Sequence, residues 1–309
     1  MINIYEVSQQ VLAERHYEAV VEELMKKDSK SPATLEKWFK AFNVNYTLKH
    51  IITARPEDLR IMMSKCKSDK YPECILELYD MYVKKFSKSD RYIGDRKQKY
   101  NAVQLMKSLE IKVCPLCNRN YINNVKSKGR LEKRTGQLDH FHNKSSYPFL
   151  SMSFFNLVPA CYGCNHTKAR FELEQTPYAE VDLDPLIRFS VSFNKIEDIF
   201  DEQHLRVSLD NHPSIQQNVD VLGLLETYTE EHNEDAFAVV KAFKNYNDVW
   251  QNSMIGNIKG LFKDKDHLSD MLLSEYIGLK DRLKSKPLAK LKKDIYEQLE
   301  AYQQSSISR

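Results

Sequence analysis

The sequence contains no run of about 18 apolar residues, which is the length that a membrane-spanning helix requires. Its opening stretch, MINIYEVSQQVLAERHYEAV, is amphipathic and contains acidic side chains, so it is unlike a secretory signal peptide. We therefore expect a soluble cytoplasmic protein without a membrane partner.

Internal repeats and low-complexity segments are also absent, which argues against a solenoid or a disordered linker. With 42% hydrophobic and 29% charged residues, the chain is able to bury a core and is not intrinsically disordered. A length of 309 residues favours about two structural units.

The chain has little excess charge of either sign, since its net charge is only +3. The charge is nevertheless unevenly distributed, because residues 107–172 carry eleven Lys or Arg against four Asp or Glu. The rest of the chain is therefore net acidic. A basic centre in an acidic frame favours a local site for a polyanion, and the alternative is a solvated Lys-rich loop around NNVKSKGRLEKRTG.

Residues 1–105 are predicted to form a helical N-terminal region. The segment SPATLEKWF is typical of a capped helix with Pro in its first turn, and apolar side chains recur upstream at helical spacing. These side chains are Tyr17, Val20, Val21 and Leu24. A second region, residues 106–180, consists of short apolar pieces, turns and paired cysteines.

Residues 181–309 are predicted to begin with a short β hairpin and to continue as helices. Apolar side chains alternate in LIRFSVSF and in LRVSL, which is the pattern of half-buried strands. A helical stripe follows at Tyr228, His232, Val239, Phe243 and Tyr246. The last helix opens at Pro287, and we expect its lysines to lie opposite an apolar face made of Leu288, Leu291, Ile295 and Leu299.

Two C-x-x-C pairs, Cys114 with Cys117 and Cys161 with Cys164, bracket the second region. Each short turn presents two thiolates to one point, and Zn²⁺ takes four such ligands in a tetrahedron. Disulfides are disfavoured in the expected compartment, and a redox motif needs only one pair. We therefore expect structural Zn²⁺, whose four protein ligands leave no place for a catalytic water.

The other two cysteines, Cys66 and Cys74, lie in the helical region and are expected to be ordinary core or partly exposed thiols.

The pattern CPLC…LDHF…YPFL…FFNLVPACYGCNHTK, residues 114–170, resembles that of the zinc-stapled HNH endonucleases. This resemblance implies an α+β fold, with a zinc-stabilised ββα-metal core flanked by helical N- and C-terminal regions. It also implies hydrolysis of phosphodiester bonds in nucleic acid, DNA or RNA. The segment KPLAKLKKDIYEQL, residues 286–299, is similar to the last helix of HNH proteins in Septu-type and retron-associated anti-phage defence systems, which act beside an ABC-type ATPase.

Carried over residue by residue, the resemblance implies a metal site and a base. Asp139 and Asn165 would bind a catalytic Mg²⁺ or Mn²⁺, and His140 would be the general base that activates water. Asn156 would fix the loop and orient the His140 ring, and Lys168 would neutralise phosphate. The chemistry agrees, because hard cations prefer oxygen ligands and an imidazole accepts a proton readily near neutral pH.

Several alternatives stay open. His142 could replace His140 as the base or contact phosphate, and His166 could replace Asn165 as the ligand. A zinc-stapled module that binds nucleic acid or docks a partner without catalysis would also place these residues together.

Neighbouring residues of a strand point to opposite faces, so Asp139 and His140 require a bulge or turn to reach one site. We expect that irregularity here.

Overall fold

The computed structural model describes residues 1–95, 99–126, 132–195, 201–245, 252–254, 268 and 282–307. The chain divides into two compact units, a larger one built from residues 3–116 and 120–182 and a smaller one built mainly from residues 183–309. The boundary predicted after residue 180 lies close to this division, whereas the chain stays in the larger unit at residue 105. No described helix is long and apolar enough to cross a membrane.

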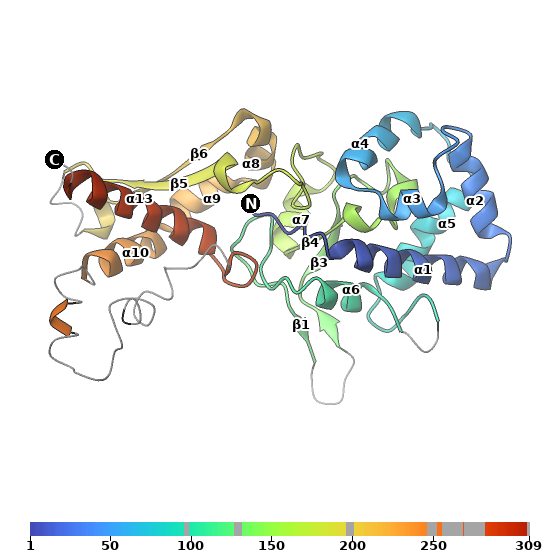
Figure 1. Ribbon diagram of the computed structural model, residues 1–309, viewed down its shortest axis with the longest axis horizontal. Coiled ribbons are helices and arrows are strands. Elements are labelled where there is room, and N and C mark those ends of the chain that lie inside the picture. Colours follow the sequence, from blue (N-terminus) through green and yellow to red (C-terminus); the bar gives the residue numbers. More distant parts are fainter. Residues whose placement is uncertain are drawn as a thin grey trace. The chain divides into compact units, whose positions relative to one another are not determined.

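Helices form the N-terminal part of the larger unit (Figure 1). They are α1 (Gln9–Lys27), α2 (Ser31–Lys40), α3 (Leu48–Thr53), α4 (Pro56–Lys65), α5 (Glu73–Met81) and α6 (Ala102–Ser108). Pro32 and Pro56 occupy the first turns of α2 and α4, where a missing N–H group costs no hydrogen bond. Val20 and Leu24 of α1 are buried as the predicted stripe requires, and Tyr17 and Val21 are half-buried.

Short strand pairs follow the helices. Strand β1 (Asn124–Val125) pairs with β2 (Lys133–Arg134), and β3 (Gln137–His140) pairs in antiparallel fashion with β4 (Leu157–Ala160). Helix α7 (Tyr162–Lys168) comes directly after β4 and contacts β3. The unit is thus a mixture of helices and small antiparallel strand pairs, in agreement with the α+β class expected from the sequence.

The segment that joins β3 to β4 connects this small sheet to the N-terminal helices. Its two 3₁₀ turns, Pro148–Leu150 and Phe154–Asn156, contact α5 in the first case and α1, α3 and α4 in the second. Phe149 and Phe154 are completely buried there. The N-terminal helices therefore form the hydrophobic core that supports the strand pair.

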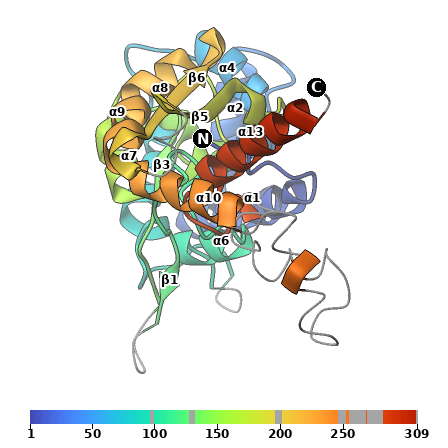
Figure 2. The ribbon, with the colours of Figure 1, turned by 90° about the vertical axis from the view of Figure 1, so that its left-hand side faces the viewer.

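The smaller unit begins with the predicted hairpin, an antiparallel pair of β5 (Ile187–Ser192) and β6 (Arg206–Asn211). Its helices are α8 (Gln216–Leu222), α9 (Leu224–Glu231), α10 (Asn233–Asn245) and α13 (Ala289–Ile307). Helix α13 lies along β5 and α10, as Figure 2 shows. The predicted stripe that starts at Tyr228 is interrupted at His232, between α9 and α10, and Tyr246 lies outside the described residues.

The apolar side of the last helix is as predicted, because Leu291, Ile295 and Leu299 of α13 are buried, as is Leu288 directly before it. The prediction that its lysines face solvent is wrong for two of them.

Lys290 and Lys293 are 0% and 5% exposed. Lys290 forms ion pairs of 2.7 Å with Asp294 and 2.9 Å with Asp184, and Lys293 lies 2.9 Å from Asp184. Carboxylates that neutralise the two ammonium groups allow the burial of side chains that helical periodicity assigns to the surface.

Candidate functional site

The two C-x-x-C pairs converge, as the sequence predicts. The Sγ atoms of Cys114, Cys117, Cys161 and Cys164 all lie within 4.8 Å of one another, and all four residues are buried. A group of four thiolates at this separation is able to hold a metal ion such as Zn²⁺.

Backbone and side-chain N–H groups surround the sulfur atoms. The amide of Cys164 donates to Sγ of Cys161 at 3.4 Å, and the Asn120 side chain donates to the same sulfur at 3.5 Å. The amide of Cys161 in turn donates to Sγ of Cys114 at 3.3 Å. Such donors favour the thiolate over the thiol, which is the form that binds metal. By contrast, Cys66 is buried, Cys74 is half-buried, and burial raises the pKa of both.

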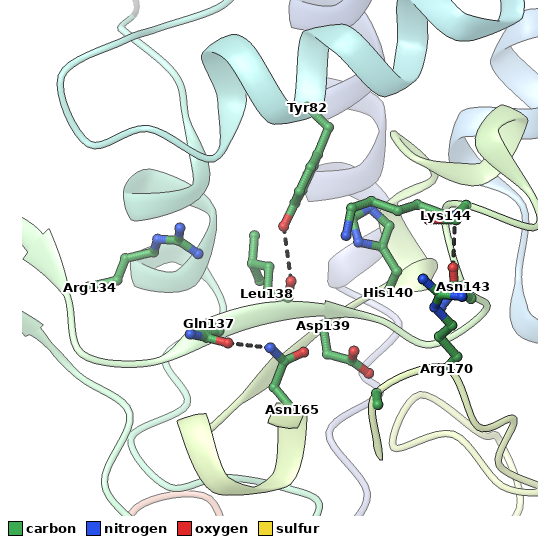
Figure 3. A pocket seen from close by; sticks show the side chains of 12 residues that line it. Tyr82, Arg134, Gln137, Leu138, Asp139, His140, Asn143, Lys144, Asn165 and Arg170 are labelled. Carbon is green, nitrogen blue, oxygen red and sulfur yellow. Dashed lines mark hydrogen bonds between the residues drawn. The ribbon is translucent and has the colours of Figure 1, made fainter. Parts of the chain in front are cut away.

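The bulge expected at Asp139 and His140 is absent. Strands β3 and β4 pair one residue to one residue throughout, with Asp139 opposite Val158 and His140 opposite Leu157. The expectation was wrong because it assumed that a site must lie on one face of the strand. In Figure 3, Asp139 lies on one side of β3 and His140 on the other.

A cavity of about 500 Å³ nevertheless brings the two residues together. It is lined by Gln137, Leu138, Asp139 and His140, which are all four residues of β3. Consecutive strand residues point to opposite faces, so a cavity that contacts all four must lie along the strand's edge. The edge opposite β4 has no strand partner among the described residues.

Side chains satisfy the carbonyl groups of this free edge. The Tyr82 hydroxyl donates to the carbonyl oxygen of Leu138 at 2.9 Å, and the Lys168 ammonium group donates to that of His140 at 2.9 Å. Both donors are buried, and a buried carbonyl without a donor is costly. The edge therefore remains open to the cavity without further strand pairing.

Asp139 is 5% exposed and forms an ion pair with the fully buried Lys168, at 3.1 Å. Burial raises the pKa of Asp139 to about 6, although Lys168 opposes the shift. Lys168, predicted to neutralise phosphate, thus pairs with Asp139 and does not line the cavity.

His140 is also 5% exposed, and its Nε2 lies 3.0 Å from the carbonyl oxygen of Ser151. Since a carbonyl only accepts, Nε2 carries the hydrogen and Nδ1 is left with the lone pair. Burial, followed by the charge of Lys144, lowers the pKa of His140 to about 3. The Tyr82 ring packs against the imidazole edge to face, with 4.2 Å between ring centroids.

Asn156 is completely buried and holds the loop that follows β3. Its Oδ1 accepts from the backbone N–H of His142 at 2.7 Å, and its Nδ2 donates to the carbonyl oxygens of His142 and Leu150, both at 3.1 Å. The His140 ring, by contrast, is oriented by Ser151 and Tyr82 rather than by the Asn156 side chain.

Asn165 of α7 lines the cavity and donates through Nδ2 to Oε1 of Gln137. In Figure 3, this bond turns the amide oxygen of Asn165 towards the side on which Asp139 lies. Both residues are on the same side of β3, so their oxygen atoms offer hard ligands to one region of the cavity.

Neither of the two alternative histidines lines the cavity. His142 is buried, with Nδ1 3.0 Å from Oε2 of Glu172. His166 is exposed on α7, where its ring stacks on that of Tyr162.

Among the cavity-lining residues that sequence reasoning missed are an aromatic residue and three cations: Tyr82, Arg134, Lys144 and Arg170. The basic composition of residues 107–172 was the available signal for the three cations. No motif pointed to Tyr82, which belongs to the π-helical turn Tyr82–Phe86 that continues α5.

No protein-family model, curated protein or solved structure matches this chain.

Proposed function

We propose that this protein is a metal-dependent HNH-type endonuclease that hydrolyses phosphodiester bonds in DNA or RNA. The proposal rests on one observation above all. A single polar cavity is lined by a carboxylate, an imidazole and a carboxamide, Asp139, His140 and Asn165, together with three cationic side chains. Residues of β3 and α7 line it, and the order β3–β4–α7 along the chain agrees with the ββα-metal arrangement that the resemblance implies.

The donor atoms fit a hard cation. Asp139 and Asn165 offer a carboxylate and an amide oxygen, which suit Mg²⁺ or Mn²⁺, whereas the cysteine cluster suits Zn²⁺. Bound Mg²⁺ would stabilise negative charge on the phosphate. Lys168 already neutralises part of the Asp139 charge, so these two residues alone make a weak site, and phosphate oxygens would complete it.

His140 would accept the proton of the attacking water through Nδ1. Its Nε2–H bond to Ser151 fixes the tautomer, and its low pKa keeps the ring unprotonated in the neutral range but also makes it a weaker base than a free imidazole. An imidazole held in one tautomer and orientation is prepared for proton transfer.

Lys144, rather than Lys168, would neutralise the scissile phosphate. It lines the cavity and lies close enough to Asp139 and His140 to influence the pKa of both. Burial lowers the pKa of its ammonium group. A partly desolvated cation interacts more strongly with an anion than one in water.

In this proposal the four cysteines bind structural Zn²⁺ and take no part in the reaction. The role in anti-phage defence, with an ABC-type ATPase partner, is proposed on the sequence resemblance alone.

The test is incubation of the purified full-length chain with plasmid DNA and with total RNA, with and without Mg²⁺. We expect cleavage of at least one substrate that depends on added Mg²⁺ or Mn²⁺ and stops with a chelator too weak to remove zinc. Nucleic-acid binding without cleavage under every metal condition would instead favour the non-catalytic binding module.

A further inference from the structure

Arg134, on β2, is a cation that lines the cavity, and one of its guanidinium nitrogen atoms has no hydrogen-bond acceptor in the part of the chain that the structure describes. Its Nη2 donates to the carbonyl oxygen of Ser87 at 2.8 Å, whereas its buried Nη1 has no acceptor among the described residues. Burial lowers the pKa of the guanidinium group. Because the guanidinium group lines the cavity, its other N–H groups are able to bind a phosphate oxygen there.

Arg170, which follows α7, lines the same cavity and is exposed. Figure 3 shows Arg134 beside the start of β3 and Arg170 beside Asn143, beyond the end of the strand. Asp139 and His140 lie between the two guanidinium groups. The cavity thus has a cation at each end and the proposed reactive groups in the middle.

We propose that Arg134 and Arg170 bind the two phosphates that flank the scissile phosphate. The substrate class is then an internal bond of a continuous polynucleotide strand. This inference rests on the proposed function and adds to it the direction in which the strand crosses the site, along β3. A nucleic-acid strand repeats its charge at every nucleotide, so it matches a row of cation, reactive centre and cation. A substrate with a single phosphodiester would engage only the centre.

The first part of the experiment uses the wild-type protein and a tetranucleotide whose central bond has one phosphate on each side. Two further tetranucleotides each replace one flanking phosphate by an uncharged methylphosphonate. We expect each replacement to lower kcat/KM for the central bond about tenfold, the usual effect of losing one charge-assisted hydrogen bond. Equal rates for all three substrates would overturn the inference.

The second part uses Arg134→Gln and Arg170→Gln. Each variant should cleave the unmodified strand slowly. Its kcat/KM should no longer fall when one of the two flanking phosphates is replaced by methylphosphonate, and this phosphate should differ between the two variants. Arg55→Gln is the matched control, because Arg55 belongs to the same unit, is exposed and does not line the cavity. This control should behave as the wild type does.

Strand binding in the absence of Mg²⁺ provides a readout that needs no cleavage. The slope of log affinity against log salt concentration should fall by about one in each arginine variant, since each loses one phosphate contact. An unchanged slope in both variants would contradict the assignment.

These outcomes separate the two proposals. A wild-type protein that cleaves no nucleic acid at all contradicts the proposed function. A protein that cleaves but ignores both flanking phosphates contradicts only the assignment of Arg134 and Arg170.

Discussion

The ammonium nitrogen of Lys168 lies 3.1 Å from a carboxylate oxygen of Asp139, and the two side chains are 1% and 6% exposed. The same ammonium group donates to the His140 carbonyl oxygen at the free edge of β3. Lys168 therefore supports both the charge of the proposed metal ligand and the backbone of the proposed base. Lys168 thus stabilises the folded site, because it neutralises the buried carboxylate and satisfies the buried carbonyl group.

Replacement of Lys168 by Met should destabilise the protein strongly, because it leaves the Asp139 carboxylate buried without a counter-charge. Removal of one partner of a buried ion pair costs about 3–5 kcal/mol of unfolding free energy. Urea unfolding measures the change. Lys84→Met is the control, since Lys84 pairs with Asp80 at the surface, where such pairs contribute at most about 1 kcal/mol. Equal losses of unfolding free energy in the two variants would show that the buried ion pair contributes no more to stability than the surface pair.

Because the four cysteines form one cluster, we expect elemental analysis of the purified protein to find one zinc ion per chain. Cys117→Ser removes one of the four convergent thiolates, so it should lower both the zinc content and the melting temperature. Cys74→Ser, outside the cluster, is the control and should keep its zinc. A normal melting curve and full zinc content for Cys117→Ser would contradict a structural metal at this site.

His140→Ala separates folding from catalysis. The variant should fold and keep its zinc, because the ring makes one hydrogen bond to Ser151 and is not part of the cysteine cluster. Its cleavage rate should fall by about 10²–10⁴-fold, the usual contribution of a general base. Cleavage is measured with Mg²⁺ on the substrate that the wild type cuts. A near wild-type rate would mean that His140 is not the base.

The buried His16 of α1 makes the unfolding free energy of the protein depend on pH. It is completely buried, with Nε2 2.8 Å from the Met152 carbonyl oxygen and Nδ1 3.1 Å from the Tyr100 hydroxyl. Burial lowers its pKa from 6.5 to about 4. The unfolded chain therefore binds a proton that the folded chain does not between these values, so the unfolding free energy decreases as the pH falls from about 6.5 to about 4.

This histidine contributes about 3 kcal/mol to that decrease, the free-energy equivalent of its pKa difference. Gln at position 16 offers a donor and an acceptor but does not titrate. The unfolding free energy of His16→Gln, measured by urea titration across this pH range, should thus depend less steeply on pH than that of the wild type. Identical slopes would contradict the burial of a neutral His16.

The strand pair β5–β6, the C-terminal helix and the convergence of the cysteines could be predicted from the sequence, because each depends on local periodicity or on ligand spacing. Lys290 and Lys293 could not, because Asp184, which pairs with both, lies more than a hundred residues away in the chain. Helical periodicity alone assigns a lysine to solvent. Asp294, four residues after Lys290, is a counter-charge within the same helix, whereas the pairing with Asp184 is revealed only by tertiary structure.

The residues of the site likewise include some that could be predicted from the sequence and some that could not. Asp139, His140 and Asn165 stand in a recognisable motif, and the structure places all three at one cavity. Tyr82 and Arg134 reach that cavity from α5's π-helical extension and from β2, outside the strand–strand–helix segment. The bulge was predicted wrongly, because a sequence pattern defines the two faces of a strand and says nothing of which edge stays open.

The central claim is that the oxygen atoms of Asp139 and Asn165 bind one hard cation together with a phosphate. Anomalous diffraction from crystals of His140→Ala with a bound oligonucleotide and Mn²⁺ tests it directly. The account predicts a manganese peak about 2.2 Å from an oxygen of each residue, in contact with a phosphate oxygen and separate from the zinc peak among the four cysteines. A manganese ion bound elsewhere, with the two side chains too far apart to share it, would contradict the account.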